Sequence, residues 1–370
     1  MRAAAVFPGK KSVGLVDMEA PKLRGPKDVK FRILEVGVCG TDREICAFEY
    51  GAPPSGADYL VLGHECMGEV VEVGPEVEGW KPGDLVVPTV RRPCTDPACT
   101  ACRAGHQDFC YTGRYTERGI NHYHGFMTEM VVDDAQYLNH VPAGLRGVGV
   151  LVEPLTIVEK ALMQVNLLQQ RLPWQCAAEP GKPAHHCHKA VVLGAGPVGL
   201  LGAMALVVAG YQTYMYSRSL APTKSSRICD QIGVKYISLQ EQNTEQMART
   251  VGNIDLVYEA VGVPPFAFDV LQVLGTNGVF IMTGVPGPFA SVPVDTSRIM
   301  KDLVLKNQVV LGTVNASREA FEHAIGDLNE FYRRWPDAVN ALITGRFPID
   351  RFEEPLQSTA GIKNVIEVGV

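Results

Sequence analysis

A glycine-rich segment that follows a short apolar run constrains the fold of this chain more than any other feature. Val191-Val192-Leu193 leads directly into Gly194-Ala195-Gly196-Pro197-Val198-Gly199, and apolar residues continue to Ala209. Strand and helix patterns on the two sides of G-x-G-x-x-G place the glycines at a helix N-terminus, where the pyrophosphate of a dinucleotide binds. The segment therefore predicts the first βα unit of a doubly wound parallel sheet.

The positions in this loop have separate expected roles. Gly194 permits a tight turn, Gly196 leaves space where a phosphate approaches, and Gly199 allows the helix to pack closely on its strand. Pro197 and Val198 open the helix and are included in the predicted cofactor site. A lone G-x-G-x-x-G would be weak evidence, so the strand before it and the helix after it carry the prediction.

Length and composition limit the classes of function. The chain has 370 residues, 46% of them apolar and 20% charged, with a net charge of −6. These values are typical of a soluble protein of two domains, and the acidic balance excludes a basic surface for nucleic acid or an anionic membrane. The uncharged residues 190–211 are long enough to span a bilayer, but a buried strand and helix explain them better. The N-terminus lacks the apolar core of a signal peptide, so we expect a cytoplasmic protein.

The pattern of elements indicates two domains and a C-terminal segment that returns to the first. Short strands with frequent Gly and Pro fill the first part of the chain, and strands alternate with helices from Ala190 to about Leu311. Such alternation is typical of a parallel sheet with crossover helices. A helix from Glu153 to Leu168 is expected to bridge the two parts. The predicted segments are residues 1–157, 158–311 and 312–370.

Four cysteines in a turn-rich segment predict a structural metal site at residues 94–110. Their spacing is Cys94-x4-Cys99-x2-Cys102-x7-Cys110. In a reducing compartment such a cluster is typically held by zinc in a closed tetrahedral thiolate site. Paired disulfides are the alternative, which is disfavoured because the sequence shows no signal peptide.

A Pro-rich connector between Leu172 and Lys189 contains the run His185-His186-Cys187-His188. Four potential ligands in a row invite a metal interpretation, but consecutive residues do not easily converge on one ion. We therefore expect a surface insertion rather than a metal site.

Further motifs are spread along nearly the whole chain. They are Cys39-Gly40-Thr41-Asp42-Arg43-Glu44-Ile45, Gly63-His64-Glu65, Gly105-His106-Gln107-Asp108-Phe109-Cys110, Gly125-Phe126-Met127, Glu153-Pro154 and Gly312-Thr313-Val314-Asn315. With the glycine loop, they resemble the motifs of the zinc-containing medium-chain dehydrogenases, the alcohol dehydrogenase family, and within it the archaeal-type glucose or aldose 1-dehydrogenases. The resemblance implies an α/β protein with a GroES-like β-rich catalytic domain and a doubly wound (Rossmann) dinucleotide-binding domain. It also implies a homodimer or homotetramer, with an exposed sheet edge near residues 278–287.

By the same resemblance, a catalytic zinc ion is held by Cys39, His64 and Glu153, while Glu65 binds directly or exchanges. Thiolate, imidazole and carboxylate with one open position suit a catalytic zinc. The metal would lower the pKa of a bound hydroxyl, and Thr41 would pass its proton onward as hydride moves to the nicotinamide. Taken singly, Cys39 could be an inert core thiol, Glu153 a helix N-terminal charge and Thr41 a structural residue.

Cofactor choice is expected to depend on the end of the second strand of the parallel sheet. NAD enzymes place Asp or Glu there for the ribose 2′-hydroxyl, whereas this chain has Ser217 and Arg218, which suit a 2′-phosphate. We therefore expect NADP, with NAD left open as a second cofactor, and two zinc ions per subunit. The resemblance assigns Asn315 to cofactor and substrate binding, and Glu117 and Glu153 to substrate binding.

The implied reaction is oxidation of the C1 hydroxyl of an aldose such as glucose to the lactone. Val90, Ile157 and Leu305 stand where sugar dehydrogenases have polar side chains, and each unpaired sugar hydroxyl would cost about 1–3 kcal/mol in an apolar pocket. Two alternatives stay open. One is the same chemistry on a less polar secondary alcohol or modified sugar, and the other is a non-catalytic NADP-binding protein, which the retained zinc ligands disfavour.

Overall fold

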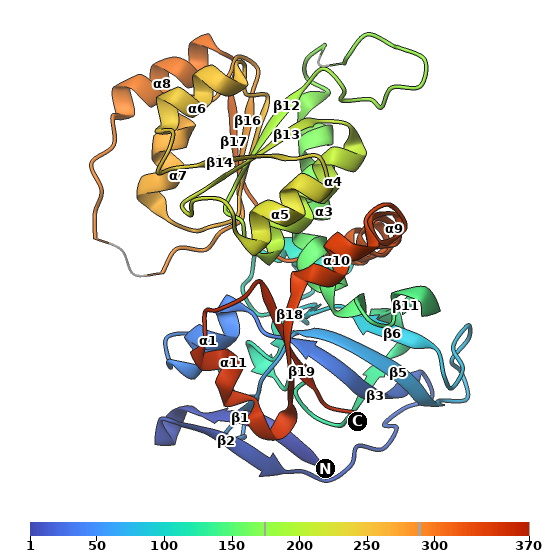
Figure 1. Cartoon of the computed structure of the whole chain (residues 1–370). Coiled ribbons are helices and arrows are strands. Elements are labelled where there is room, and N and C mark those ends of the chain that lie inside the picture. The colour runs from blue at the N-terminus through green and yellow to red at the C-terminus, as the bar shows by residue number, and fades with distance from the viewer. Residues whose placement is uncertain (174, 288–289, 370) are drawn as a thin grey trace. The chain divides into compact units, whose positions relative to one another are not determined.

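Residues 1–173, 175–287 and 290–369 are described by the computed structural model, which divides into two compact units (Figure 1). Unit 1 comprises Met1–Thr156 and Asn315–Val370, and unit 2 comprises Ile157–Val314. The unit that contains the N-terminus thus also contains the last strands of the chain. Among the described residues, no helix has both the length and the apolar character that crossing a bilayer requires.

Unit 2 is built on a six-stranded parallel sheet in the order β14-β13-β12-β15-β16-β17. The strands are β12 (Lys189–Leu193), β13 (Gln212–Ser217), β14 (Lys235–Ser238), β15 (Leu256–Glu259), β16 (Val279–Met282) and β17 (Val309–Gly312). The helices are α3 (Val152–Gln169), which begins in unit 1, α4 (Pro197–Ala209), α5 (Lys224–Gln231), α6 (Thr244–Val251), α7 (Pro264–Leu271) and α8 (Thr296–Leu305). The strand order reverses between β12 and β15, and doubly wound sheets bind ligands at the carboxyl ends of strands at such a reversal.

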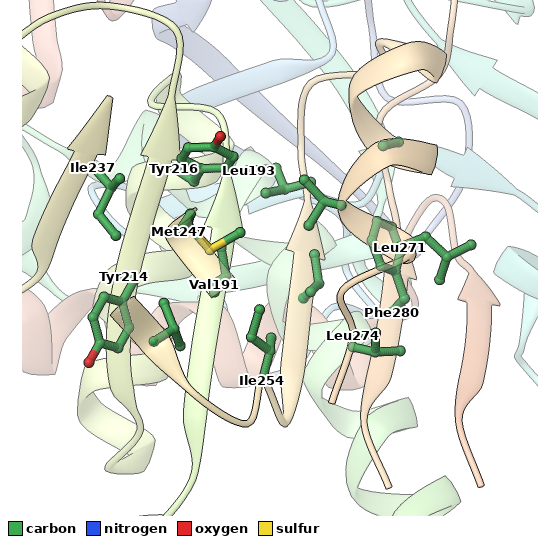
Figure 2. Packing of buried hydrophobic residues seen from close by; sticks show 14 residues of the cluster. Val191, Leu193, Tyr214, Tyr216, Ile237, Met247, Ile254, Leu271, Leu274 and Phe280 are labelled. Atoms are coloured by element: carbon green, nitrogen blue, oxygen red, sulfur yellow. The ribbon is translucent and has the colours of Figure 1, made fainter. Parts of the chain in front are cut away.

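Both faces of this sheet are buried, which accounts for its nearly continuous apolar strands. Val191 and Leu193 of β12 belong to one cluster with Tyr216 of β13 and Phe280 of β16 (Figure 2). Val192, which points to the opposite face of β12, is fully buried as well. A strand covered on both sides has no need of the apolar–polar alternation of a half-exposed strand.

The glycine loop joins β12 to α4. Gly194 has a φ of 95°, in the left-handed region, and Gly196 is the N-cap of α4. Pro197 and Val198 form the start of the helix and are half-buried. A Cβ on Gly199 would lie 1.9 Å from the Gly194 carbonyl oxygen, whereas a Cβ on Gly196 would meet nothing within 4 Å. The loop thus combines a closely packed turn with open space at a helix N-terminus.

Unit 1 is mainly antiparallel. Its largest sheet has the order β11-β6-β5-β3-β19-β18, and β10 also pairs with β3. These strands are β3 (Asp28–Gly37), β5 (Glu65–Val73), β6 (Leu85–Pro88), β10 (Met130–Asp134), β11 (Leu138–Val141), β18 (Ile343–Pro348) and β19 (Lys363–Glu367). Two smaller sheets contain β1 (Arg2–Phe7), β2 (Ser12–Asp17) and β4 (Leu60–Val61), and β7 (Arg91–Arg92), β8 (Thr116–Arg118) and β9 (His122–Tyr123). Because β3 lies between β5 and β19, a strand from the end of the chain pairs directly with the long strand β3.

The helices of unit 1 are short apart from one near the C-terminus. They are α1 (Gly40–Cys46), α2 (Thr100–Arg103), α9 (Arg318–Arg334), α10 (Pro336–Leu342) and α11 (Glu353–Gln357). α1 follows β3 after two residues, so its N-terminus stands at the end of the central strand. This junction carries the first of the expected metal ligands.

One expectation about the parallel sheet is wrong. Residues 278–287 were expected to form an exposed sheet edge, but β16 lies between β15 and β17. The edge strand on this side of the sheet is β17, in which Val310 is 39% exposed, and β14 forms the other edge. The helix expected from Glu153 to Leu168, in contrast, is α3. Sequence periodicity identifies a buried strand but not its place in the strand order.

Substitution of two glycines in the loop tests the packing of α4. Gly199→Ala is expected to destabilise the protein by at least about 2 kcal/mol, because the new methyl group would collide with the Gly194 carbonyl. Gly196→Ala is the matched control, since its φ of −83° suits alanine, and it is expected to cost less than about 1 kcal/mol. Urea unfolding measures both variants, and equal stabilities would contradict the close packing of α4.

Candidate active site

Cys39, His64 and Glu65 come together at one end of the large sheet of unit 1. One potential ligand atom of each residue lies within 4.8 Å of those of the other two. β3 ends at Gly37, and Gly37 pairs with Glu65 at the start of β5. The antiparallel register therefore places Cys39, the N-cap residue of α1, beside the residues that begin β5.

Asp42 supports two of these residues from the first turn of α1. Its Oδ2 accepts a hydrogen bond from the Cys39 backbone N–H at 2.9 Å, and its Oδ1 lies 3.5 Å from His64 Nδ1. Burial lowers the pKa of His64, but the charge of the fully buried Asp42 outweighs this effect and raises the pKa well above its usual value. With Nδ1 directed to Asp42, Nε2 of His64 is the nitrogen left for a metal.

Glu65 is held by a lysine that sequence reasoning missed. Lys363 Nζ donates to both carboxylate oxygens of Glu65, at 2.7 and 2.6 Å. Both side chains are almost completely buried. The only signal in the sequence was a lysine at the start of an apolar strand, and such a lysine is usually solvated. Pairing of β19 with β3 makes this one a buried partner of Glu65.

Glu153 and Thr41 lie near this group but outside its closest contacts. Glu153 is in the first turn of α3 and is half-buried. Burial raises the pKa of its carboxyl to about 7, although charge on His64 acts against this effect. The Thr41 hydroxyl lies 4.0 Å from Cys39 Sγ. Thiolate, imidazole and carboxylate groups thus gather in one region, and this donor set fits a catalytic zinc.

Cys94, Cys99, Cys102 and Cys110 also converge. Their sulfur atoms all lie within 4.8 Å of one another, and all four are free thiols. Cys99 Sγ and Cys110 Sγ are 3.9 Å apart. A tetrahedron with Zn–S bonds of ~2.3 Å has an S–S edge of ~3.8 Å. The geometry therefore fits a structural zinc and argues against the disulfide alternative.

Glu117 and Asn315, which the resemblance assigns to the sugar, are hydrogen-bonded to each other. Asn315 Nδ2 donates to Glu117 Oε1 at 2.8 Å, although the two residues are 198 positions apart. The same oxygen accepts a hydrogen bond from Arg91 Nε at 3.0 Å, and Arg91 stacks on the ring of Tyr115. Glu117 is 4% exposed. The expected pair is thus assembled within unit 1, with its carboxylate held by two donors.

The three apolar positions of the expected pocket have unlike surroundings. Val90 is buried in unit 1, whereas Ile157 and Leu305 belong to unit 2. Ile157 is half-buried in α3, and Leu305 is 68% exposed at the end of α8. The apolar pocket wall that these three positions would form stays a prediction.

The expected cofactor residues lie at the carboxyl ends of β12 and β13. Ser217 ends β13 and is half-buried, while the next residue, Arg218, is exposed. Ser225 Oγ donates to the Ala195 carbonyl at 2.8 Å, which ties α5 to the glycine loop. Residues 217–223 contain one guanidinium group and no carboxylate. This end of the strand therefore suits a phosphate better than a bare ribose.

Glu259, at the end of β15, is a buried residue that sequence reasoning missed. Its Oε1 accepts hydrogen bonds from the backbone N–H groups of Val261 and Gly262, both at 2.7 Å, and its Oε2 accepts one from Gly284 at 3.3 Å. The carboxylate therefore joins the loops that follow β15 and β16, next to the reversal of strand order. The available signal was a charged residue at the end of an apolar strand. A charge buried there needs several hydrogen-bond donors, so it indicates loops that pack around it.

Comparison with known proteins identifies the family. The model of the alcohol dehydrogenase GroES-like domain matches residues 25–143, and that of the glucose dehydrogenase C-terminus matches residues 146–368. The chain is 38% identical to the glucose 1-dehydrogenase of Methanocella arvoryzae over 371 residues, which cover all of both chains. It is also 38% identical to that of Thermoproteus tenax over 373 residues, which cover all of this chain and 99% of the relative.

A solved structure gives the same result. Haloferax mediterranei glucose dehydrogenase in complex with NADP, Zn and gluconolactone is similar with a TM-score of 0.87 and 32% identity, over all of both chains. Fold and sequence together define a zinc-containing medium-chain dehydrogenase, and the chain belongs to this family. Within the family it is a glucose 1-dehydrogenase-like, NAD(P)-dependent enzyme. The expected family and the α/β fold with GroES-like and Rossmann parts are confirmed.

Asp42→Asn keeps the size of the side chain and removes the charge that faces His64. We expect the zinc affinity of the Cys39 site to fall by about 10–100-fold, because the carboxylate orients the ring and raises its basicity. Glu44→Gln, a neutralisation in the same helix, is the control and is expected to leave the affinity unchanged. Competition with a chromophoric chelator measures both. Equal affinities would show that Asp42 does not support the metal site.

Proposed function

We propose that the protein oxidises the C1 hydroxyl of an aldose such as glucose to the lactone and transfers hydride to NADP. The observation that carries the proposal is the convergence of Cys39, His64 and Glu65, with Glu153 nearby. Similarity to glucose 1-dehydrogenases over the full length supports the substrate class, and the Haloferax structure with gluconolactone supports the product.

Cys39, His64 and Glu153 are the proposed ligands of the catalytic zinc. When bound, zinc supplies a Lewis acid that lowers the pKa of a substrate hydroxyl. Side chains of the protein perform the remaining tasks. Asp42 holds the His64 ring in the tautomer that leaves Nε2 for the metal. Thr41 is the proposed group that accepts the hydroxyl proton and passes it toward solvent.

Glu65 is proposed as an exchanging ligand that Lys363 controls. Each Glu65 oxygen accepts one hydrogen bond from the ammonium group and keeps a second lone pair, so the carboxylate can approach a metal while Lys363 still holds it. Lys363 thereby holds the Glu65 carboxylate close to the site. Glu153, which has no such cationic partner among its described hydrogen bonds, is the better third ligand.

Glu117 and Asn315 are proposed to bind the sugar. A carboxylate accepts hydrogen bonds at about four lone-pair positions, and an amide both donates and accepts. Glu117 Oε1 already has two donors, Arg91 and Asn315, so its other oxygen keeps acceptor capacity for a hydroxyl. The pair could therefore both donate hydrogen bonds to sugar hydroxyls and accept them. Because the two side chains are already ordered, binding would cost little side-chain entropy.

Unit 2 is proposed to bind NADP at the glycine loop, with Ser217 and Arg218 at the 2′-phosphate. The four cysteines of residues 94–110 are proposed to hold a second, structural zinc. We further propose a homodimer or homotetramer in the cytoplasm, with β17 as the available sheet edge. The proposed catalytic part is residues 1–157 together with 312–370, and the proposed cofactor part is residues 158–311.

The reaction is tested by following NADP reduction with glucose, galactose and xylose. Metal-replete protein is expected to reduce NADP with at least one aldose, and chelation is expected to abolish the signal until zinc is restored. Cys39→Ser is expected to lower kcat/KM by about 100-fold or more, because it weakens a ligand of the catalytic metal. Cys46→Ser, a half-buried thiol at the end of α1, is the control and should leave kcat/KM close to wild type.

The other outcomes separate the alternatives. Zinc-dependent activity with simple secondary alcohols, and none with aldoses, would overturn the aldose and keep the chemistry. Binding of NADP without turnover of any alcohol would favour the non-catalytic protein. Equal activity of the Cys39 and Cys46 variants would remove Cys39 from the proposed ligand set.

Arg218→Ala tests the choice of cofactor. We expect kcat/KM for NADP to fall by about 10–100-fold, since a charge-assisted hydrogen bond contributes about 1.5–3 kcal/mol, while kcat/KM for NAD changes little. Lys235→Ala removes the same charge from the opposite end of the neighbouring strand β14 and is the control. An equal loss with both cofactors would show that Arg218 does not contact the 2′-phosphate.

A further inference from the structure

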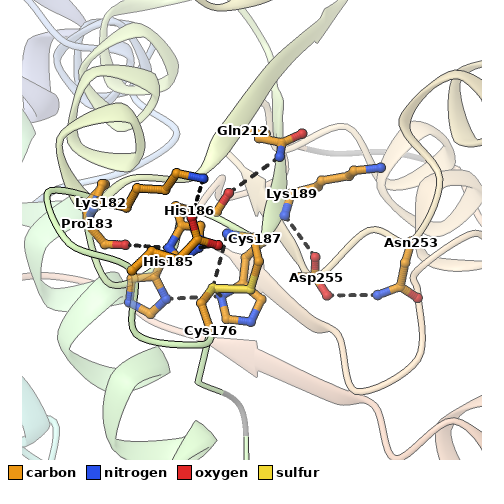
Figure 3. Close-up of a disulfide and its surroundings, with 12 residues drawn as sticks. Cys176, Lys182, Pro183, His185, His186, Cys187, Lys189, Gln212, Asn253 and Asp255 are labelled. Atoms are coloured by element: carbon orange, nitrogen blue, oxygen red, sulfur yellow. Dashed lines mark hydrogen bonds and ion pairs between the residues drawn. A yellow bond between two sulfur atoms is a disulfide. The ribbon is translucent and has the colours of Figure 1, made fainter.

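The connector between α3 and β12 contains a compact group of sulfur and nitrogen atoms that the proposed reaction does not use. Figure 3 shows a disulfide between Cys176 and Cys187, with His185 beside it. Cys176 Sγ lies 3.8 Å from His188 Nδ1, which in turn lies 3.2 Å from His185 Nδ1. One ligand atom each of Cys176, Cys187 and His188 falls within 4.8 Å of the other two. Two sulfur atoms and two imidazoles therefore gather in one small volume.

The sequence predicts only a surface insertion here, because the four consecutive residues His185–His188 do not easily converge on one ion by themselves. A turn brings the first and last residues of the run together, since the His188 N–H donates to the His185 carbonyl at 2.9 Å. Cys176 then joins them from 11 residues before Cys187. His186 faces elsewhere, with Nδ1 at 2.9 Å from the Pro183 carbonyl. The residues that converge are thus His185 and His188 from the run, with Cys176 from outside it.

The body of unit 2 supports both rings. His185 stacks on Tyr211 with ring centroids 4.5 Å apart, and His188 is 6% exposed. The Gln212 N–H donates to the His188 carbonyl at 2.9 Å, which ties the cluster to β13. Cys176 and His185 also line a cavity of about 990 Å³ beside α3, which gives an ion access from solvent.

We propose that Cys176, Cys187 and His188, with His185 as the fourth ligand, form a Cys2His2 zinc site when the disulfide is reduced. A tetrahedral site with Zn–N bonds of ~2.0 Å and Zn–S bonds of ~2.3 Å has an N–N edge of ~3.3 Å and an S–N edge of ~3.5 Å. The corresponding separations here are 3.2 Å and 3.8 Å. To complete the site, the two sulfur atoms must separate after reduction, and His185, which lies outside the 4.8 Å group, must turn toward them.

Opening of the Cys176–Cys187 disulfide requires a reductant, and a dithiol can supply it. The dithiol supplies two electrons and two protons, which break the S–S bond and give two thiols, and it becomes a disulfide itself. Zinc binding then releases both thiol protons to solvent. In either state a cross-link closes the connector where it enters β12, the strand that leads to the glycine loop. The site is separate from the two proposed zinc sites of unit 1, so the proposal does not rest on the proposed function.

The test compares the zinc content of the full-length protein before and after reduction with a water-soluble phosphine. After reduction, zinc addition and removal of unbound metal, wild type is expected to hold one more zinc ion per chain than the unreduced protein. His188→Ala is expected to lose this additional ion. His186→Ala, a change in the neighbouring histidine that faces Pro183, is the matched control and is expected to retain it. Elemental analysis measures all three proteins.

Cobalt substitution shows where the additional ion binds. The reduced His186→Ala protein is expected to show extra thiolate-to-cobalt charge-transfer absorption relative to reduced His188→Ala, and Cys187→Ser is expected to resemble His188→Ala. Thermal unfolding of each variant checks that it is folded. An unchanged zinc content on reduction, or an additional ion that His188→Ala and Cys187→Ser both retain, would overturn the proposal.

Discussion

The ion pair between Lys363 and Glu65 is the interaction on which the site in unit 1 depends. The Glu65 carboxylate lies against Gly37 at the end of β3. A Cβ on Gly37 would lie 2.1 Å from Glu65 Oε2, so a side chain there would collide with the carboxylate. Lys363 Nζ also donates to the Val38 carbonyl at 3.3 Å, next to Cys39, the first proposed metal ligand. Because either charge alone would be uncompensated in the interior, separation of the pair is strongly unfavourable. The last strand of the chain is therefore held against the segments that carry Cys39 and the start of β5.

Buried carboxylates organise both units in the same way. Asp42 accepts from the Cys39 backbone and faces His64, and Glu259 accepts from three backbone N–H groups. Several donors to one carboxylate offset the cost of burying its charge. Asp42 stands in the first turn of a helix, and Glu259 stands at the end of a strand. The loops that are expected to contact metal and cofactor are thereby held by charges of the scaffold.

The three clusters of potential metal ligands among the described residues differ in the number and state of their sulfur atoms. This difference determines which chemistry each cluster suits. The Cys39 group combines one thiol with imidazole and carboxylates, a mixture that leaves room for a substrate oxygen on zinc. The four cysteines of residues 94–110 supply a complete set of thiolates and suit a closed site. The Cys176 group contains two sulfurs in a disulfide, so its capacity to bind a metal depends on reduction. One chain thus carries ligand sets suited to catalysis, to structure and to a redox-dependent cross-link.

Sequence alone determined the features whose signals are close together in the chain. The glycine loop, the cysteine spacing and the strand–helix alternation each depend on neighbouring residues, and the family motifs place Cys39 and His64 in order. Tertiary structure decided which distant groups meet. Lys363 pairs with Glu65, and Asn315 bonds Glu117, only because the C-terminal segment of the chain enters the same unit as residues 1–156. Burial and hydrogen-bond partners depend on strand pairing, which local periodicity does not specify, so these contacts could not be predicted.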